Sequence, residues 1–243
     1  MNGILAKMNL LSRRKLLPML AFPLVLPLAG CGDREADRAR AFADFLQKRV
    51  LDRPGVHIPV LSDEERAAIG PYDAAFAILK GYNDDLTAAL REFGDALHPA
   101  PKNVPPLDLP QYKPDLLKAR DFFPRASAAV DSAFAKAEAA RAQLKLPELV
   151  KAKYDAAFNQ LVTAPANALR EIVPLSIAAM NSEIAVVDFI EAHRAELKPA
   201  GGKIHASKPG LRKQLETLLA DYSASFAKVQ ASRRKLELAV QGD

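Results

Sequence analysis

The stretch that decides the fold is residues 72–97, YDAAFAILKGYNDDLTAALREFGDAL. One set of residues recurs in it at alternating steps of four and three: Tyr72, Phe76, Leu79, Asn83, Leu86, Leu90, Phe93 and Leu97. This spacing is a heptad seam, which places an apolar stripe along a helix and predicts that the helix packs against others. The expected fold class is therefore all-α, an elongated helical bundle with coiled-coil-like seams.

Asn83 is the polar member of this seam. A buried asparagine at such a position fixes helix register at a cost in stability. The alternative is that Asn83 sits at the edge of the seam in water. The spacing leaves both interpretations open.

Helical spacing also extends over residues 33–53, 115–145 and 149–197. Ser62 and Glu65 match a capping box and predict a further helix start. Prolines at 124, 165 and 174 predict kinks or short breaks. The last helix, from Leu211 to about Val240, repeats the seam with a second set of residues: Leu215, Leu218, Tyr222, Phe226, Val229, Leu236 and Val240.

Two segments between these helices predict connections. Residues 98–114 hold six prolines, a density that no helix or central strand accepts, and we expect a stiff, partly polyproline linker. Residues 198–210 form a loop rich in glycine and proline. Within it, residues 203–205 could form a short strand, placed beside an extended connector at residues 56–60.

The first thirty residues carry the pattern of an export signal. The first fifteen residues contain no acidic residue and four basic ones, Lys7, Arg13, Arg14 and Lys15. An apolar run, residues 16–28, follows them. A helix of that length reaches only about 20 Å, too short to span a bilayer. The run therefore indicates a signal peptide and not a permanent transmembrane helix.

The residues that follow, Leu28-Ala29-Gly30-Cys31, resemble the lipobox of bacterial lipoproteins at all four positions. The resemblance implies a diacylglyceryl group on the Cys31 sulfur, cleavage before Cys31 and acylation of the new amine. We therefore divide the chain into a lipoprotein signal peptide, residues 1–30, and a single helical envelope domain, residues 31–243. The alternative is an ordinary secretory signal that ends near a buried structural cysteine.

Lipidation at Cys31 would make the membrane a partner of the chain, since several acyl chains form a stable anchor. By the sorting rule known for enteric bacteria, Asp after the lipidated residue retains a lipoprotein in the inner membrane. The residue after Cys31 is Gly32, which by this rule favours transport to the outer membrane. Asp33, one place later, counts against that location. The expected location is the cell envelope, facing the periplasm, with the outer membrane favoured over the inner.

Composition excludes one class of function. Residues 1–30 hold four of the 34 Lys and Arg and none of the 29 Asp and Glu, so the remaining chain is nearly neutral. A nucleic-acid partner therefore loses its main support. The chain has one cysteine, and if this carries lipid, packing without a disulfide must hold the domain together.

The sequence offers no pattern typical of catalysis. The four histidines, His57, His98, His193 and His205, do not stand three or four residues from one another, and no Glu-x-x-His pair occurs. One cysteine cannot supply a cysteine-based metal site, and no nucleophile elbow or phosphate loop is present. We therefore expect no catalytic residues, no metal, no cofactor and no enzymatic activity.

Three stretches together resemble the YiaF-type family of proteobacterial lipoproteins, a family of unknown function. They are Cys31-Gly32-Asp33 with the Arg-Ala-Phe-x-x-Phe-Leu-Gln run that ends at Gln47, the run from Pro59 to Tyr82, and the run from Tyr154 to Ala166. The resemblance implies an envelope lipoprotein of helical fold. It assigns no residue beyond the lipidated cysteine.

These observations favour a non-enzymatic, lipid-anchored helical domain that contacts other envelope proteins through an exposed seam or loop. The alternative is a carrier of a small ligand, in which kinks at Pro165 and Pro174 open a pocket. A buried apolar cavity of several hundred cubic ångströms with a few polar groups would favour the alternative.

Overall fold

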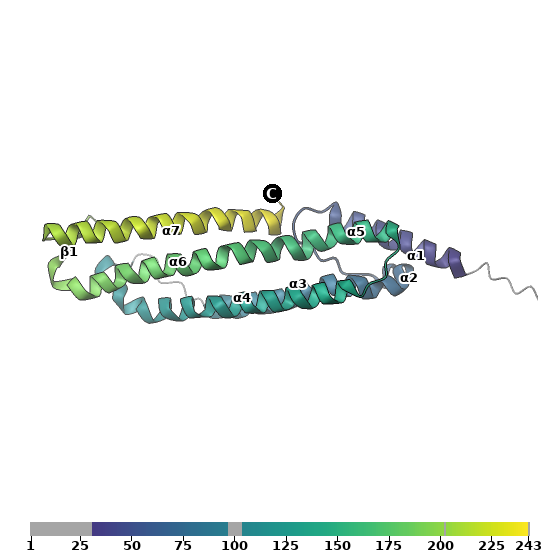
Figure 1. Ribbon diagram of the computed structural model, residues 1–243, viewed down its shortest axis with the longest axis horizontal. Coiled ribbons are helices and arrows are strands. Elements are labelled where there is room, and N and C mark those ends of the chain that lie inside the picture. The colour runs from purple at the N-terminus through teal and green to yellow at the C-terminus, as the bar shows by residue number, and fades with distance from the viewer. Residues whose placement is uncertain (1–30, 97–103, 202, 243) are drawn as a thin grey trace, which may run out of the picture.

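The structure, a computed structural model, describes residues 31–96, 104–201 and 203–242. The described chain is elongated and almost entirely helical, with long helices side by side along one axis and a small hairpin at one end (Figure 1). The all-α prediction is confirmed. The predicted signal peptide, with lipobox residues 28–30, lies outside the described residues, as do Leu97 and residues 98–103 of the predicted linker.

The body begins with α1 (Cys31–Leu46), which continues through a π-helical turn, η2 (Gln47–Leu51). The apolar residues Phe42, Leu46 and Val50 are fully buried, so this helix packs into the core. A connector without helix or strand follows and ends at Ser62.

A capping box starts α2 (Asp63–Ile69), as predicted. The Ser62 hydroxyl accepts from the Glu65 backbone N–H at 3.1 Å, and the Glu65 carboxylate accepts from the Ser62 backbone N–H at 2.8 Å. These two bonds satisfy backbone donors that a helix start leaves free. A 3₁₀ turn, η3 (Gly70–Tyr72), then leads into α3 (Asp73–Ala96), which carries the heptad seam.

Kinks or short breaks are predicted at the interior prolines, and of these two alternatives the breaks do not occur. The helices α4 (Lys113–Ala142) and α6 (Ala164–His193) run through Pro124 and Pro174, whose rings both lie on an exposed face. Packing of a long helix outweighs the one backbone hydrogen bond that each proline removes.

The third proline, Pro165, is the second residue of α6 and lies within a continuous helical path, which it does not break either. The chain reaches it from α5 (Glu148–Phe158) through a π-helical turn, η5 (Asn159–Thr163). A 3₁₀ turn, η6 (Arg194–Glu196), follows α6. This path is therefore helical from Glu148 to Glu196.

The predicted linker 98–114 is partly helical, which corrects the polyproline expectation for its second half. Residues 106–112 form a 3₁₀ helix, η4 (Pro106–Tyr112), and α4 begins at Lys113 with Pro114 in its first turn. Proline fits both elements because its fixed φ is compatible with a first helical turn.

The Gly/Pro loop 198–210 contains a hairpin of β1 (Leu197–Ala200) and β2 (Lys203–Ala206). The strand expected at residues 203–205 exists, but its partner is wrong: β2 pairs antiparallel with β1 and not with residues 56–60. Two strands joined by a short turn pair locally, which avoids the entropy of closing a long loop.

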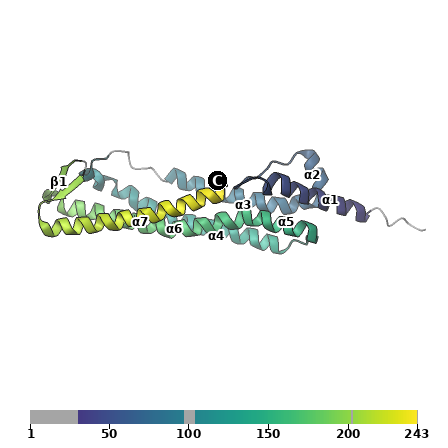
Figure 2. The ribbon, with the colours of Figure 1, turned by 90° about the horizontal axis from the view of Figure 1, so that it is seen from above.

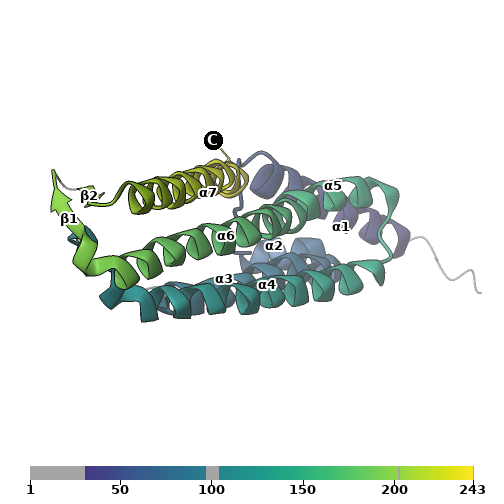
Figure 3. The ribbon, with the colours of Figure 1, turned by 60° about the vertical axis from the view of Figure 1, so that its left-hand side comes forward.

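The last helix, α7 (Pro209–Gln241), runs back along α6. Figures 1 and 3 show α7 on one side of α6 and α3 and α4 on the other, and Figure 2 shows α7 running from the hairpin end to the middle of the body. The second predicted seam is therefore only partly buried. Leu215 is buried, whereas Phe226 is 46% exposed and Val240 is 41% exposed, because α7 packs mainly on a single long helix.

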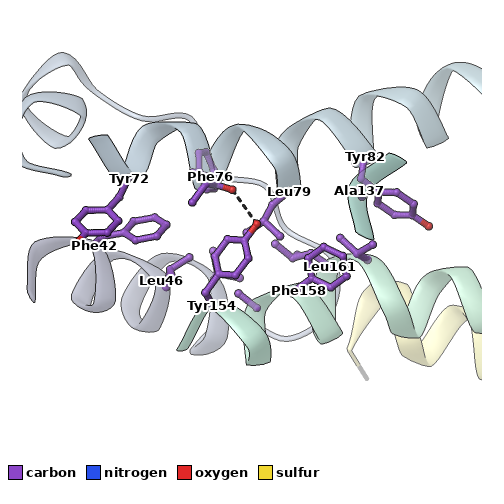
Figure 4. Packing of buried hydrophobic residues seen from close by; sticks show 14 of the residues in the cluster. Phe42, Leu46, Tyr72, Phe76, Leu79, Tyr82, Ala137, Tyr154, Phe158 and Leu161 are labelled. Carbon is purple, nitrogen blue, oxygen red and sulfur yellow. Dashed lines mark hydrogen bonds between the residues drawn. The ribbon is translucent and has the colours of Figure 1, made fainter. Parts of the chain in front are cut away.

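The core is densest where α1, α3 and α5 meet (Figure 4). Phe42 stacks on Tyr72 with ring centroids 5.4 Å apart, and Phe45 meets Phe76 edge to face at 5.1 Å. The buried Tyr154 hydroxyl donates to the Ala75 carbonyl oxygen at 3.0 Å. A second, smaller cluster lies at the hairpin end, around Phe189, Ile190 and Leu215 of α6 and α7.

The α3 seam is confirmed at Tyr72, Phe76, Leu79 and Leu86, which are all buried. Asn83 is half-buried at the edge of the seam, and the residue that faces the core on that turn is Tyr82, 2% exposed. The side chains of Leu90 and Phe93 lie outside the described part. The structure thus favours the edge interpretation of Asn83.

Candidate functional site

An apolar pocket of about 430 Å³ lies between α4, α6 and the last turns of α7. This volume is within the roughly 300–1,000 Å³ typical of small-molecule sites. Leu86 of α3 adds to the lining. The apolar walls come from three helices: Phe123, Ala126 and Val130 of α4, Pro165, Leu169, Ile172 and Val173 of α6, and Leu236 and Val240 of α7.

The pocket lies beside α6, between two helices that have few contacts with each other. α4 packs on α3 and α6, whereas α7 packs mainly on α6, and the pocket is the wedge between α4 and the last turns of α7. On α4 the side chains that face this wedge include the small Ala126 and Ser127. Protein interiors normally leave few such voids, so the space is a feature that needs an explanation.

The middle of α6 is poorly covered for its composition. In the described chain, the path Glu148–Glu196 is the one helix that is long and apolar enough to cross a membrane, and 28% of its most apolar window is buried. Ile172 and Val173 are only half-buried where they line the pocket. An apolar helix surface of this kind is usually covered by another element.

Polar side chains stand around the pocket, and most already bond to the protein. The Ser176 hydroxyl donates to the Ile172 carbonyl oxygen at 2.9 Å. The Arg233 Nε donates to the Glu237 carboxylate at 2.8 Å. The pocket therefore offers contact area but few free hydrogen-bonding groups.

Arg170 is the cation of the lining. Its Nε donates to Asp131 Oδ1 of α4 at 2.7 Å, and its guanidinium lies 4.4 Å from the centre of the Phe134 ring. These contacts join α4 to α6 beside the pocket. Burial raises the pKa of the nearby Tyr82 to about 12, and the positive charge of Arg170 acts in the opposite direction.

The end of α7, one wall of the pocket, is fixed to the connector after η2. The Val56 backbone N–H donates to the Val240 carbonyl oxygen at 2.7 Å. From η5, the Gln160 side-chain amide donates to the carbonyl oxygens of Arg53 and Gly55, both at 2.8 Å. We call these bonds the Gly55 latch.

Cys31, the predicted lipidation site, is the first residue of α1, at one end of the described body (Figure 1). Its side chain is outside the described part, so the lipid attachment stays a prediction. Of the four histidines, His57 and His205 are exposed, His193 Nδ1 lies 3.1 Å from Glu196 Oε2, and His98 is not described. Among the described residues, no group of three or more His, Cys, Asp or Glu could hold a metal.

The sequence indicated part of this site. Pro165, one of the two prolines that suggested a pocket, lines it, whereas the exposed Pro174 does not. The wall residues on α4 and α7 carried no signal of their own. Apolar residues at helical spacing look the same whether they face a neighbouring helix or an open space.

The geometry defines the class: an elongated, mostly helical protein with an apolar pocket of ligand size between α4, α6 and α7. The chain belongs to the family described as "Protein of unknown function (DUF3053)", whose model matches residues 19–237. It is similar to the uncharacterized protein YiaF of Escherichia coli K12 and of Shigella flexneri, with 30% identity over 177 residues, 71% of this chain and 73% of each relative. No solved structure matches it. The resemblance to a YiaF-type family is confirmed.

Proposed function

We propose that the chain is a non-enzymatic envelope lipoprotein, anchored through Cys31, whose helical body binds an apolar ligand in the α4–α6–α7 pocket. The observation that carries the binding function is the 430 Å³ apolar cavity. Its volume and its apolar walls support a ligand carrier over a solid bundle.

The anchor is proposed from the lipobox residues and from the place of Cys31. A lipid on the first residue of α1 would hang from one end of the elongated body, so the rest of the body could extend from a membrane surface (Figure 1). The pocket would then stand away from the anchor, on the periplasmic side.

Binding of an uncharged fluorescent dye, N-phenylnaphthylamine, to the purified full chain tests the pocket. Ala126→Phe places a ring in the cavity, and Ala129→Phe, on the exposed side of the same helix, is the matched control. We expect the dye to brighten with wild type and with Ala129→Phe, and to bind at least tenfold more weakly to Ala126→Phe. Equal binding to all three proteins would refute the pocket as the site.

A second candidate function is contact with envelope proteins through the outer side of α7. Leu219 is 41% exposed and Phe226 is 46% exposed, and their seven-residue spacing places them on one face. Exposed large apolar side chains that share a face are typical of interaction sites.

A photo-crosslinking amino acid at position 226 tests this candidate in cells. The control position is Ala231, which is also exposed on α7. A discrete adduct from position 226 and none from 231 would support the contact. No adduct at 226, together with a monomeric purified protein, would argue against it.

A further inference from the structure

We propose that the ligand of the α4–α6–α7 pocket is a single acyl chain, supplied by a free fatty acid or by a phospholipid. This inference rests on the proposed binding function and names its ligand class. Three features support it: the length of the pocket, its apolar walls and the half-buried apolar residues of α6.

The pocket is long in one direction. On α6 its lining extends from Pro165 to Ser176, which corresponds to roughly 16 Å of helix. The lining of α4 runs from Phe123 to Val130, beside the same stretch of α6. Because the lining residues extend along both α4 and α6, the space between these helices is elongated. An extended aliphatic chain fits such a space.

The walls suit a ligand that needs no directional bonds. Phe123 is the single aromatic residue of the lining, and the other apolar wall residues are aliphatic side chains and proline. Ser176, Arg170 and Glu237 already bond to protein groups. A ligand with several polar groups would lose its hydration without recovering hydrogen bonds, whereas methylene groups gain dispersion and hydrophobic contact.

An acyl chain would also cover the apolar surface that the fold leaves open. Ile172 and Val173 are half-buried in the structure, and a chain along the pocket would lie against both. Its polar head would lie near Arg170 and Glu237, the two charged side chains of the lining, each of which keeps its ion pair with Asp131 or Arg233. Charges of both signs accept either a carboxylate or a zwitterionic phospholipid head, so the experiment must separate the two sources.

Native mass spectrometry of the full chain, purified from its envelope in detergent, identifies the occupant. The covalent anchor adds the same mass to every variant, so it does not interfere. We expect a non-covalent adduct on wild type and on Ala129→Phe, and its loss in Ala126→Phe. A released mass that matches a fatty acid or a phospholipid tells which source is used. Equal adducts on all three proteins would overturn the proposal.

A spectroscopic experiment tests the position of the chain. The protein has no tryptophan, so Phe123→Trp introduces one reporter at the pocket wall and Phe226→Trp one on the outer side of α7. Palmitate brominated along its chain quenches tryptophan on contact. We expect saturable quenching for Phe123→Trp and only the weak quenching of free solution for Phe226→Trp. Equal quenching of both reporters would overturn the proposal.

The experiments distinguish an incorrect ligand class from an incorrect binding function. One outcome is that N-phenylnaphthylamine binds to wild type and Ala126→Phe blocks this binding, while brominated palmitate neither quenches Phe123→Trp nor displaces the dye. In that case the pocket binds apolar ligands and the acyl-chain assignment is wrong. If neither probe binds, the proposed binding function itself is wrong. Thermal unfolding of Ala126→Phe checks that it is folded, and Val173→Phe, from the facing wall, serves as a second blocking variant.

Discussion

Gly55, in the connector after η2, lies directly against Val240, in the last turn of α7. A Cβ atom on Gly55 would lie 2.3 Å from the Val240 carbonyl oxygen, the same oxygen that accepts from the Val56 N–H. Gly55 also has φ +73°, a backbone conformation that residues with a side chain rarely adopt. The Gly55 latch thus needs glycine for two reasons, and it fixes the last turn of the α7 wall.

Gly55→Ala is expected to destabilise the protein by roughly 1–3 kcal/mol, because the new methyl group adds backbone strain and displaces the end of α7. Thermal unfolding by circular dichroism measures the effect. Gly210→Ala is the control, since a Cβ there meets nothing within 4 Å and the residue lies in the first turn of α7. A Gly55→Ala protein as stable as Gly210→Ala would mean that the latch does not hold α7.

Removing the hydroxyl group from each of two buried tyrosines should affect the free energy of unfolding differently. Tyr154 donates to the Ala75 carbonyl oxygen, so Tyr154→Phe should lower the free energy of unfolding by about 1 kcal/mol. The Tyr82 hydroxyl is buried without a partner in the described structure, so Tyr82→Phe should leave stability unchanged or raise it. Urea unfolding measures both. Equal losses would indicate that the Tyr82 hydroxyl has a partner such as ordered water.

Asn83→Leu is expected to change the melting temperature little, because Asn83 lies at the edge of the α3 seam. Leu79→Asn, at a position that is 0% exposed in the same seam, should destabilise by several kcal/mol. Calorimetry of the two variants compares the positions directly. A clear rise in melting temperature for Asn83→Leu would place the asparagine inside the seam after all.

Asp155 should make stability depend on pH. Its carboxylate accepts from Lys151 Nζ at 2.9 Å and from Arg141 at 2.8 Å, and these bonds hold the pKa of Asp155 below its ordinary value, while partial burial acts in the opposite direction. Because the folded pKa is the lower one, the stabilisation is complete above the unfolded pKa of about 4 and is lost as the pH falls through the folded value.

Asp155→Asn should therefore reduce stability by about 1 kcal/mol or less at neutral pH, and the difference from wild type should shrink in acid. Urea unfolding across a pH series measures it. Asp37→Asn removes an ion pair that is about 70% exposed at Asp37 and should show no such trend. A difference that stays constant down to acidic pH would exclude the ionised carboxylate as its cause.

Lipid attachment at Cys31 predicts a simple labelling result. In cells grown with a fatty-acid probe, the wild-type chain should take up label and Cys31→Ser should not, because the thiol is the proposed attachment point. Gel fluorescence after probe conjugation measures the label. If both proteins label equally or neither labels, the anchor and the envelope location that depends on it must be abandoned.

Local features of the fold could be predicted because they depend on neighbours in sequence. The capping box at Ser62 and Glu65 and the buried row from Tyr72 to Leu86 follow from spacings of three and four residues. Kinks or short breaks were the prediction at Pro124 and Pro174, and the helices continue without a break because the propensity of one residue is weaker than the packing of a thirty-residue helix. The strand at 203–205 was found, but its partner depended on which segment lay nearest.

By itself, the sequence determined the helical class, the apolar side of the long helices and the family resemblance, and it shows the likeness of residues 28–31 to a lipobox. Only the tertiary structure decided how completely each apolar side is covered. The spacing in α7 shows which side is apolar. Phe226 is nevertheless exposed and Leu236 lines the pocket, because α7 packs mainly on α6 and has few contacts with α4. Burial depends on the number of neighbours in space, a quantity that periodicity along one chain segment does not contain.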